Sequence, residues 1–461
     1  MKRNVLKGFS GILLAGVLVF SAGCRKEAEL EKQPPSQQPA VSTPVNNYNA
    51  NVPLQWYNLY LKVERYADGF RPPVSARALA YIGLSGYEAG VSGMPDNESM
   101  DEVFPGLDIP DSDIYSEYHW PTAINAAYAR SMRLYFPHVD TEYGQDIDNL
   151  EDALNNYYEG EMSEEVYVRS RVYGVEVANA IFQWAQTDET GKYGYMENHP
   201  VYNPPSCVGC WQPTGPDYTP ALLPFWGDAR TFAMSGQDFE IEPPLPFTED
   251  ENSALYVQAM EVYELYPLEY EDQWIAEFWS DDIFELTCTP VGRWVSIANQ
   301  AAQQYEVNLE EALELYAKLG LAMNDAGVSC WYNKYEYDVA RPSDFIKEYI
   351  DSGWETHLIT LHDCLNPPFP AYPSGHAAFS SAAAGVLADQ FGSDITFTDN
   401  SHEDRDEFMG MPRTYSSWHE MAVENAYSRI PLGVHYQMDA DAGVDLGYVA
   451  SDRVLELPWG N

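Results

Sequence analysis

Hydrophobic residues along most of the chain recur three or four positions apart, which is the period of an α-helix with one buried face. Strict alternation of apolar and polar residues, which marks a half-buried strand, is scarce. The pattern therefore predicts an all-α protein. The expected helices cover residues 74–90, 122–136, 163–186, 254–266, 268–279, 294–304, 309–326, 345–350, 377–390, 417–427 and 434–454.

The start of the chain follows a different pattern. Basic residues precede an apolar run at residues 12–20, and small residues then lead to Cys24. The run is too short to span a membrane, so it indicates a signal peptide, residues 1–23, followed by a lipidated cysteine. The cleavage site resembles a bacterial lipobox, although Ser21 stands where an aliphatic residue is more usual. An uncleaved membrane anchor is the alternative, and both place the protein on the outer face of a bacterial envelope membrane.

The segment at residues 24–52 is polar and contains four prolines, which is typical of a flexible tether. The remaining residues, 53–461, are long enough for one large helical domain or for two packed halves. The whole chain is 45% hydrophobic and 14% aromatic, which is ample for a core. Apart from the start of the chain, no stretch has the length and hydrophobicity needed to cross a membrane.

The charge of the chain is strongly negative, with 25 basic and 71 acidic residues and a formal net charge of −46. This balance argues against nucleic acid as a partner, because few basic side chains remain to meet phosphates. It suits a protein that stays soluble in a salty medium, where self-repulsion is screened. Acidic residues gather at 399–407 without the spacing of an EF-hand, so a solvated acidic loop is predicted there rather than a calcium site.

The cysteines that follow the signal segment are Cys207, Cys210, Cys288, Cys330 and Cys364. An exported chain meets oxidising conditions, so some of these residues should form disulfides. Cys207 and Cys210 lie in a loop rich in proline and glycine, and a local disulfide is predicted between them. Cys330 and Cys364 flank the motifs described next and are a second candidate pair, although sequence does not determine the connectivity.

The segment at residues 367–376 carries the first candidate chemistry. A proline-rich run ends at Ser374, Gly375 and His376, and a helical pattern of small residues begins at once. Ser374 is expected to cap this helix, so free backbone N–H groups and the helix dipole would favour a bound oxyanion. Gly375 would let the anion approach the backbone, and His376 can carry protons near neutral pH. An isolated loop-to-helix junction of this composition could also have no catalytic role.

Lys334 and Arg341 form a second candidate group, seven positions apart. On a helix that spacing is close to two turns, so both cations are expected on one face, with Pro342 ending the helix after them. The alternative is an ordinary solvated face.

The third candidate group is Arg429, His435 and Asp439. The spacing of four residues would let Asp439 accept a hydrogen bond from Nδ1 of His435 and leave Nε2 available. A buried structural histidine is the alternative. Together, the three groups would place three cations and two histidines around one anion.

These patterns, K-x6-R-P, P-S-G-H and S-R-x5-H-x3-D in this order, resemble the signature of the PAP2-type acid phosphatases and vanadium-dependent haloperoxidases. The resemblance is closest to the chloroperoxidase branch, in residues 367–377 and 428–435. Weaker similarity extends over most of residues 53–461. The resemblance implies two packed helical bundles, an N-terminal half at residues 53–246 and a catalytic bundle at residues 247–461.

The resemblance also implies that vanadate is the cofactor and that His435 is the vanadium ligand. His376 would act as acid–base, Lys334 would polarise hydrogen peroxide, and Asp439 would orient His435. Asp282 would be a partner for Arg429. The residues implied to hold vanadate are Lys334, Arg341, Ser374, Gly375, His376, Arg429 and His435.

A haloperoxidase would use hydrogen peroxide to oxidise halide to hypohalous acid, which can halogenate an organic acceptor. The alternative is a phosphatase for phosphate monoesters, in which His435 is the nucleophile and His376 protonates the leaving group. We favour the haloperoxidase because the resemblance includes the residues that flank the motifs. Phe369 occupies the position where the chloroperoxidase branch has an aromatic residue and bromoperoxidases tend to have histidine. This aromatic residue predicts ready oxidation of bromide and iodide, with chloride as a further candidate, unless the ring only fills the loop between its prolines.

Overall fold

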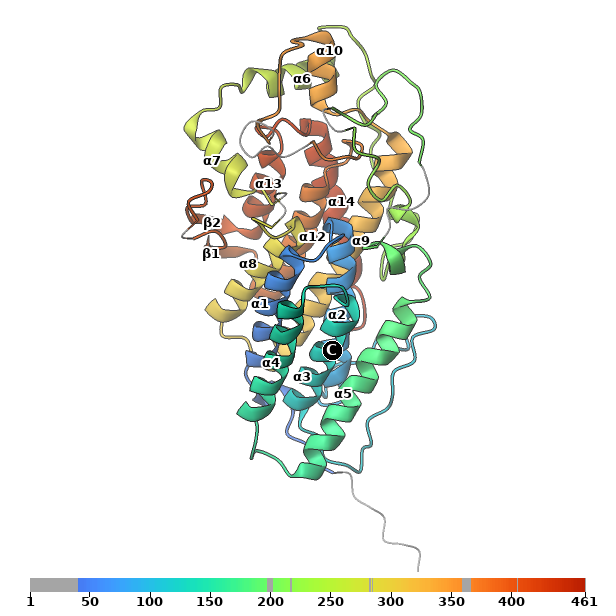
Figure 1. Cartoon of the computed structure of the whole chain (residues 1–461), viewed down its shortest axis with the longest axis vertical. Helices are drawn as coiled ribbons and strands as arrows, with labels where there is room; N and C mark the ends of the chain where they lie inside the picture. The colour runs from blue at the N-terminus through green and yellow to red at the C-terminus, as the bar shows by residue number, and fades with distance from the viewer. Residues whose placement is uncertain are drawn as a thin grey trace, which may run out of the picture. The chain divides into compact units, whose positions relative to one another are not determined.

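The computed structural model describes residues 40–196, 202–215, 218–281, 283, 285–358, 366–403 and 405–460. These residues belong to one compact unit that begins at Ala40. In the described residues this unit has thirteen α-helices and one two-stranded sheet, so the all-α prediction is confirmed (Figure 1). The α-helices are α1 (Asn51–Arg65), α2 (Pro72–Val91), α3 (Trp120–Tyr135), α4 (Thr141–Tyr157), α5 (Glu164–Ala185), α6 (Ala254–Glu264), α7 (Tyr270–Phe278), α8 (Pro290–Gln304), α9 (Leu309–Tyr337), α10 (Pro342–Tyr349), α12 (Gly375–Phe391), α13 (Trp418–Ser428) and α14 (Gln437–Leu455). Short 3-10 helices cover Val45–Asn47, Gly191–Tyr193 and Trp226–Asp228.

Each helix expected from the hydrophobic period is present, but the pattern missed α1 and α4. Helix α4 buries only Tyr143, Ile147, Glu151 and Leu154, a narrow stripe on an otherwise polar helix. Helix α9 also continues to Tyr337, well beyond the predicted end at residue 326. Its last turns bury polar residues as well as apolar ones, which hides the helical period there.

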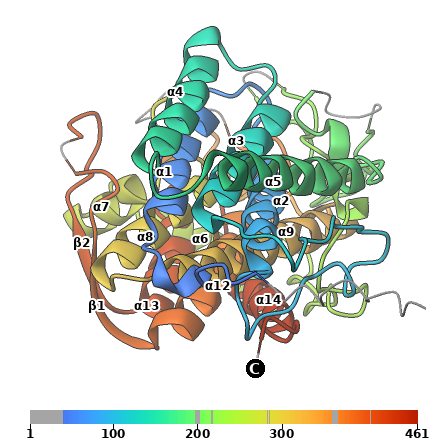
Figure 2. The ribbon, with the colours of Figure 1, turned by 90° about the horizontal axis from the view of Figure 1, so that it is seen from below.

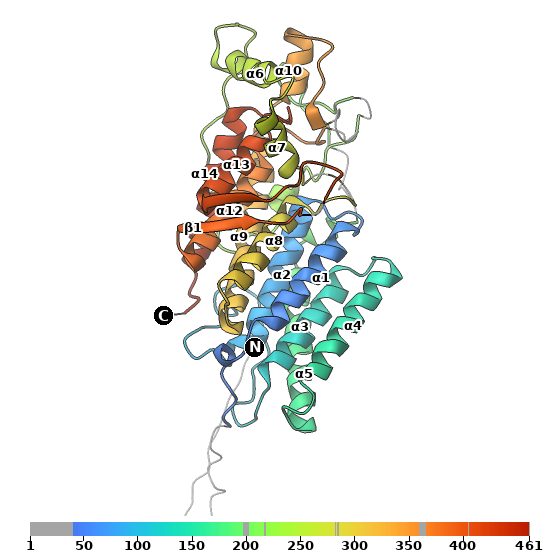
Figure 3. The same cartoon turned by 90° about the vertical axis from the view of Figure 1, so that its left-hand side faces the viewer.

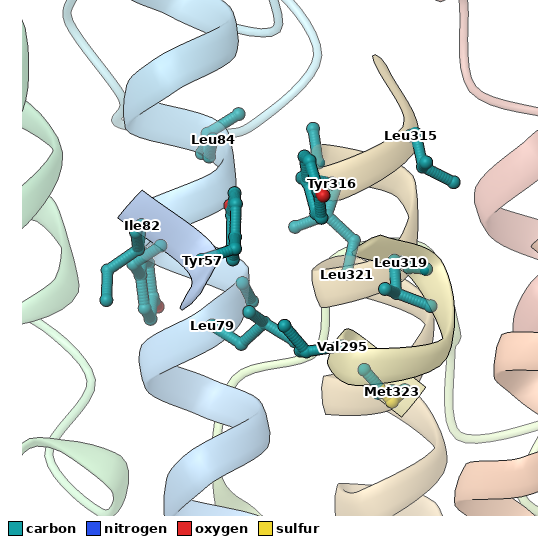
Figure 4. Packing of buried hydrophobic residues seen from close by; sticks show 14 of the residues in the cluster. Tyr57, Leu79, Ile82, Leu84, Val295, Leu315, Tyr316, Leu319, Leu321 and Met323 are labelled. Atoms are coloured by element: carbon teal, nitrogen blue, oxygen red, sulfur yellow. The ribbon is translucent and has the colours of Figure 1, made fainter. Parts of the chain in front are cut away.

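Two helices at the centre of the unit, α2 and α9, pack directly against each other. Glycine permits the close approach, because a Cβ at Gly83 of α2 would lie 2.7 Å from the carbonyl oxygen of Tyr316 on α9. Tyr57 of α1 stacks on Tyr316 with ring centroids 3.8 Å apart, and Figure 4 shows this packing with Leu79 nearby. Helix α9 thus joins the helices before residue 247 to those after it.

Around this pair the helices form two groups. Helices α3 and α5 cover α2 on one side, as Figure 2 shows. Helices α12, α13 and α14 pack together, α12 and α14 lie against α9, and the small sheet lies beside α13 (Figure 3). The cluster of buried hydrophobic residues is continuous from α1 to α14. A boundary between two halves at residues 246 and 247 stays a prediction.

The small sheet corrects one expectation about the acidic segment at residues 399–407. Strand β1 (Asp394–Asp399) pairs antiparallel with β2 (Arg413–Ser417). Asp399, at the end of β1, is fully buried, and its Oδ2 accepts a hydrogen bond from Nε of Arg293 at 3.0 Å. The prediction of a solvated loop is therefore wrong for Asp399, because a buried guanidinium neutralises it. Asp406 and Glu407 are exposed as expected.

The cysteine predictions have different outcomes. The disulfide between Cys207 and Cys210 is confirmed, with Cα atoms 5.3 Å apart. Cys330 is a free thiol, so its predicted pairing with Cys364 is wrong. The side chain of Cys330 is buried inside the helix packing, where its Sγ lies 3.7 Å from the carbonyl oxygen of Pro373. Cys364 itself lies outside the described residues.

The expected signal peptide and Cys24 also lie outside the described residues. The tether ends earlier than residue 52, because Val45 is fully buried and its N–H donates to the carbonyl of Gly93 at 3.0 Å. The apolar side chain of Val45 inserts into the core, which the polar composition around it conceals. Within the part of the chain that the structure describes, no helix combines the length and the hydrophobicity required to cross a membrane.

Candidate active site

The second motif adopts a different backbone from the one predicted. Helix α9 ends at Tyr337, Asp338 takes a left-handed conformation with φ of 53°, and Arg341 is the N-cap of α10. Pro342 is thus the first residue of α10 and does not end α9. Proline suits this position because its fixed φ is helical and its missing N–H has no partner to lose there. The prediction that Lys334 and Arg341 share one helical face is wrong.

The linker nevertheless brings the two cations together. The Nζ atom of Lys334 lies 5.1 Å from the centre of the Phe369 ring, and the guanidinium of Arg341 lies 4.9 Å from it. Both side chains are buried, with at most 1% of either residue exposed. The two cations therefore flank one aromatic ring at the start of the proline-rich segment.

The first motif has the predicted geometry. Ser374 caps α12, and its side chain accepts a hydrogen bond from the N–H of Ala377 at 3.5 Å. Gly375 and His376 form the first turn. The N–H of Ser374 donates to the carbonyl of Asp439 at 2.8 Å, which ties the cap to α14. A Cβ at Gly375 would lie 3.3 Å from the indole ring of Trp331, so glycine keeps the end of the helix open.

A small cavity of about 20 Å³ lies at this helix end. Its lining includes Gly375 of α12 and two prolines that begin other helices, Pro72 of α2 and Pro290 of α8. The positive ends of three helix dipoles therefore meet at one cavity, which favours an anion. The remaining lining residues are Trp331, Pro367, Phe369, His376, Phe379, Arg429 and His435.

Lys334 is held by the proline-rich segment. Its Nζ donates to three backbone carbonyls, those of Pro370, Ala371 and Pro373, at 3.0, 3.0 and 2.5 Å. Burial lowers the pKa of Lys334 to about 7, and the nearby guanidinium of Arg341 acts in the same direction. The ammonium group is therefore fixed beside the cavity, with a pKa that a bound anion would raise.

The third motif has the predicted hydrogen bond, with Nδ1 of His435 lying 2.9 Å from Oδ2 of Asp439. On its other side, Nε2 of His435 lies 3.1 Å from Nη1 of Arg341. A guanidinium only donates, so Nε2 must carry the lone pair and Nδ1 the proton. Arg341 also donates to the carbonyl oxygens of Val434, at 2.8 Å, and Phe369, at 3.0 Å.

The electrostatics of this pair follow from its burial. Burial lowers the pKa of His435 well below its ordinary value, and Arg341, Lys334 and Arg429 act in the same direction. Burial also raises the pKa of Asp439 to about 7, while the hydrogen bond from the N–H of Tyr436 opposes that rise. His435 is therefore a neutral imidazole that presents a lone pair, which is the form that binds a metal or attacks an electrophile.

The structure brings together the predicted site residues that it describes, with His376, Arg429 and Phe369 on the wall of the same cavity. The Phe369 ring lies 5.0 Å from the Trp331 ring, so it forms part of this wall and does more than fill the loop. Trp331 is a wall residue that none of the three motifs indicates. The available signal was its position three residues before Lys334 on one helix face. Asp282 lies outside the described residues.

Comparison with known proteins agrees with this geometry. A family model described as the VCPO second helical-bundle domain matches residues 314–457. The chain is 25% identical to the vanadium chloroperoxidase of Curvularia inaequalis over 507 residues, covering 89% of this chain and 82% of that protein. A shorter match, 34% identical over 99 residues, relates 20% of the chain to 18% of the vanadium-dependent bromoperoxidase of Ascophyllum nodosum.

Solved structures show the same relationship. The structure described as the first bacterial vanadium-dependent iodoperoxidase superposes with a TM-score of 0.78 at 28% identity, covering 90% of this chain and 98% of that one. A holo-type bacterial vanadium-dependent chloroperoxidase has a TM-score of 0.62 at 16% identity, over 84% of this chain and 92% of that one, which shows a shared fold. The resemblance drawn from the three motifs is confirmed.

Proposed function

We propose that this chain, a relative of the vanadium-dependent haloperoxidases, is itself a vanadate-dependent haloperoxidase. It would use hydrogen peroxide to oxidise halide ions to hypohalous acid. The observation that carries the proposal is the gathering of Lys334, Arg341 and Arg429 around a neutral His435. His435 and Arg429 line the small cavity, and Lys334 and Arg341 flank the ring of Phe369, which lines it as well. In a chain with a net charge of −46, three cations buried around one histidine indicate a site for an anion.

The residues present suit vanadate. The imidazole of His435 offers one nitrogen ligand, and the buried cations can neutralise the charge on vanadate oxygens. The carboxylate of Asp439, in the third motif, already accepts hydrogen bonds from Nδ1 of His435 at 2.9 Å and from the N–H of Tyr436 at 3.0 Å. When bound, vanadate would act as a Lewis acid that activates hydrogen peroxide, and the oxidation state of the vanadium would not change.

The residues of the chain have separate tasks in this proposal. Asp439 keeps the proton of His435 on Nδ1, so Nε2 carries the lone pair. That lone pair now accepts from Nη1 of Arg341 at 3.1 Å, and vanadate would take the place of this hydrogen bond. His376, in the first turn of α12, exchanges protons with the incoming peroxide. Lys334 supplies a positive charge beside the cavity, held in place by three carbonyls.

Iodide and bromide are the halides that we propose. The aromatic wall formed by Phe369 and Trp331 would leave the attacked peroxide oxygen less solvated and therefore more electrophilic, which supports oxidation of iodide and bromide. The relationship to a protein described as an iodoperoxidase supports the same choice. An organic acceptor would then react with the hypohalous acid.

The test uses purified protein with and without orthovanadate. Peroxide-dependent oxidation of iodide and bromide should require vanadate and should be inhibited by phosphate, which competes for the same site. Hydrolysis of p-nitrophenyl phosphate is measured in parallel. Hydrolysis without any halide oxidation by the vanadate-loaded protein would replace this proposal with a phosphatase that uses His435 as its nucleophile.

We also propose that the mature protein is anchored to a bacterial envelope membrane through lipidated Cys24. The basic start, the apolar run at residues 12–20 and the small residues before Cys24 support this location. Mass spectrometry of the mature N-terminus tests it. An intact chain that retains residues 1–23 and an unmodified Cys24 would refute it.

A further inference from the structure

The loop closed by the Cys207–Cys210 disulfide lies directly against the linker that carries Arg341. Cys210 pairs with Val339 in an antiparallel bridge. The N–H of Trp211 donates to the carbonyl of Asp338 at 2.7 Å, and the N–H of Ala340 donates to the carbonyl of Gly209 at 3.0 Å. Three consecutive linker residues, 338–340, are therefore held by the disulfide loop.

The opposite edge of this linker contacts the proline-rich segment. The N–H of Ala371 donates to the carbonyl of Val339 at 2.8 Å, and the carbonyl of Ala371 accepts from Nζ of Lys334 at 3.0 Å. The linker is thus the middle layer between the disulfide loop and the segment that leads to Ser374. A displacement of the linker would reach the anion cavity through the proline-rich segment, whose Pro367 and Phe369 line that cavity.

The linker ends at Arg341, whose side chain has strict positional requirements. Its guanidinium donates to the carbonyls of Phe369 and Val434 and to Nε2 of His435, over distances of 2.8 to 3.1 Å. Three acceptors on two different segments leave the guanidinium little freedom, provided that its own backbone is fixed. The linker itself is neither helix nor sheet, so that fixation must come from its neighbours.

The disulfide is the covalent constraint on the loop that contains its two cysteines. Between residues 202 and 215 the loop contains no helix and no strand beyond the single bridge at Cys210. Gly209 takes a left-handed conformation with φ of 80°, and a Cβ there would lie 2.3 Å from the Phe247 ring. A disulfide restricts the conformations that such a turn can adopt, which keeps the Gly209 carbonyl and the Trp211 N–H in register with the linker.

From these contacts we propose that the Cys207–Cys210 disulfide is a positioning element for Arg341, and through it for the bound oxyanion. The inference rests on the proposed function, since it takes the cavity to hold vanadate or phosphate. The disulfide touches neither the anion nor His435, so it acts only through the linker.

Binding of the anion to the vanadate-free protein tests this proposal without any assay of turnover. Isothermal titration calorimetry measures the Kd of orthovanadate, and separately of phosphate, at one fixed pH and salt concentration. Cys207→Ala/Cys210→Ala should bind both anions roughly 10-fold more weakly than wild type, the size of effect typical of groups that orient direct ligands. Val208→Ala is the matched control, because it lies in the same loop, is 69% exposed and leaves the disulfide intact.

A double-mutant cycle separates positioning from general destabilisation. In an Arg341→Lys background, loss of the disulfide should cause little further weakening. In an Arg429→Lys background the full weakening should persist, because Arg429 lies on a different segment. Equal weakening in both backgrounds would overturn the proposal, as would unchanged affinity after loss of the disulfide.

A second perturbation covers the case in which the double cysteine variant does not fold. The disulfide of folded wild type is reduced with dithiothreitol, which donates two electrons and is itself oxidised to a cyclic disulfide. The reagent is then removed under anaerobic conditions before the titration. Reduced protein that binds as tightly as oxidised protein contradicts the proposal. Wild type that binds neither anion in any state contradicts the proposed function instead.

Discussion

Replacement of Asp439 by asparagine is the sharpest test of how the site is held. Asp439 is fully buried. Its Oδ2 accepts from Nδ1 of His435 at 2.9 Å and from the N–H of Tyr436 at 3.0 Å. An asparagine side chain is nearly the same size as an aspartate, so the packing should survive the change. Its neutral carbonyl would accept these hydrogen bonds more weakly, and the orientation of the imidazole would be less secure.

The expected size of the effect follows from this geometry. Loss of a group that orients a ligand histidine typically weakens metal affinity by about 10- to 100-fold, which corresponds to roughly 1.4 to 2.7 kcal/mol. Asp439→Ala should cost more, because the buried N–H groups of His435 and Tyr436 would both lose their acceptor, at about 1 to 3 kcal/mol each. Neither change removes the Nε2 ligand, so both should harm the site less than His435→Ala.

The assay pairs calorimetry with orthovanadate and steady-state kinetics of iodide oxidation. Asp441→Asn is the matched control, because Asp441 lies on the same helix and is exposed. Asp439→Asn should weaken vanadate affinity and lower kcat, while Asp441→Asn should change neither. If the two variants bind vanadate equally well, Asp439 does not orient His435, and the interpretation of the third motif is wrong.

Three other perturbations have distinct expected outcomes. His435→Ala should abolish vanadate binding by calorimetry and halide oxidation, and near wild-type turnover would contradict the role of His435. Phe369→His should lower the ratio of bromide to iodide oxidation and leave phosphate-ester hydrolysis nearly unchanged; an unaltered halide ratio would exclude a role for the ring in selectivity. Burial raises the pKa of Glu88 to about 7 in the folded state, above its unfolded value. The contribution of Glu88 to the free energy of unfolding is therefore complete below pH about 4.5, where its carboxyl group is protonated in both states. This contribution falls by roughly 3 kcal/mol as the pH rises through about 7. Urea unfolding between pH 5 and 8 should show this loss in wild type and a smaller loss in Glu88→Gln, whereas parallel pH profiles would refute it.

The parts of the site that the sequence predicted well are those set by neighbours within one turn. Ser374 caps α12 because its hydroxyl reaches an N–H three residues later, and the preceding prolines cannot continue a helix backwards. Asp439 reaches His435 because it lies in the first turn of α14, where its carboxylate folds back over the N-cap residue Tyr436 toward the residue before it. Local chemistry of this kind does not depend on the rest of the fold.

The parts that could not be predicted depend on contacts between distant segments. The burial of Asp399 requires Arg293, and the aromatic wall requires Trp331 of α9 to meet Phe369 of the proline-rich segment. Cys330 is a free thiol because α9 turns it toward the carbonyl of Pro373 rather than toward another cysteine. None of these partners can be identified from spacing alone.

Arg341 shows why a single proline has two interpretations. A proline after a helical pattern can end that helix or begin the next one, and the residues around Pro342 are compatible with both. The choice is made at Asp338, where the chain leaves α9 in a left-handed conformation and its carbonyl accepts the N–H of Trp211 at 2.7 Å. That hydrogen bond comes from a loop more than a hundred residues earlier in the chain. The position of the arginine that contacts His435 is therefore determined by a partner that no pattern near Arg341 could reveal.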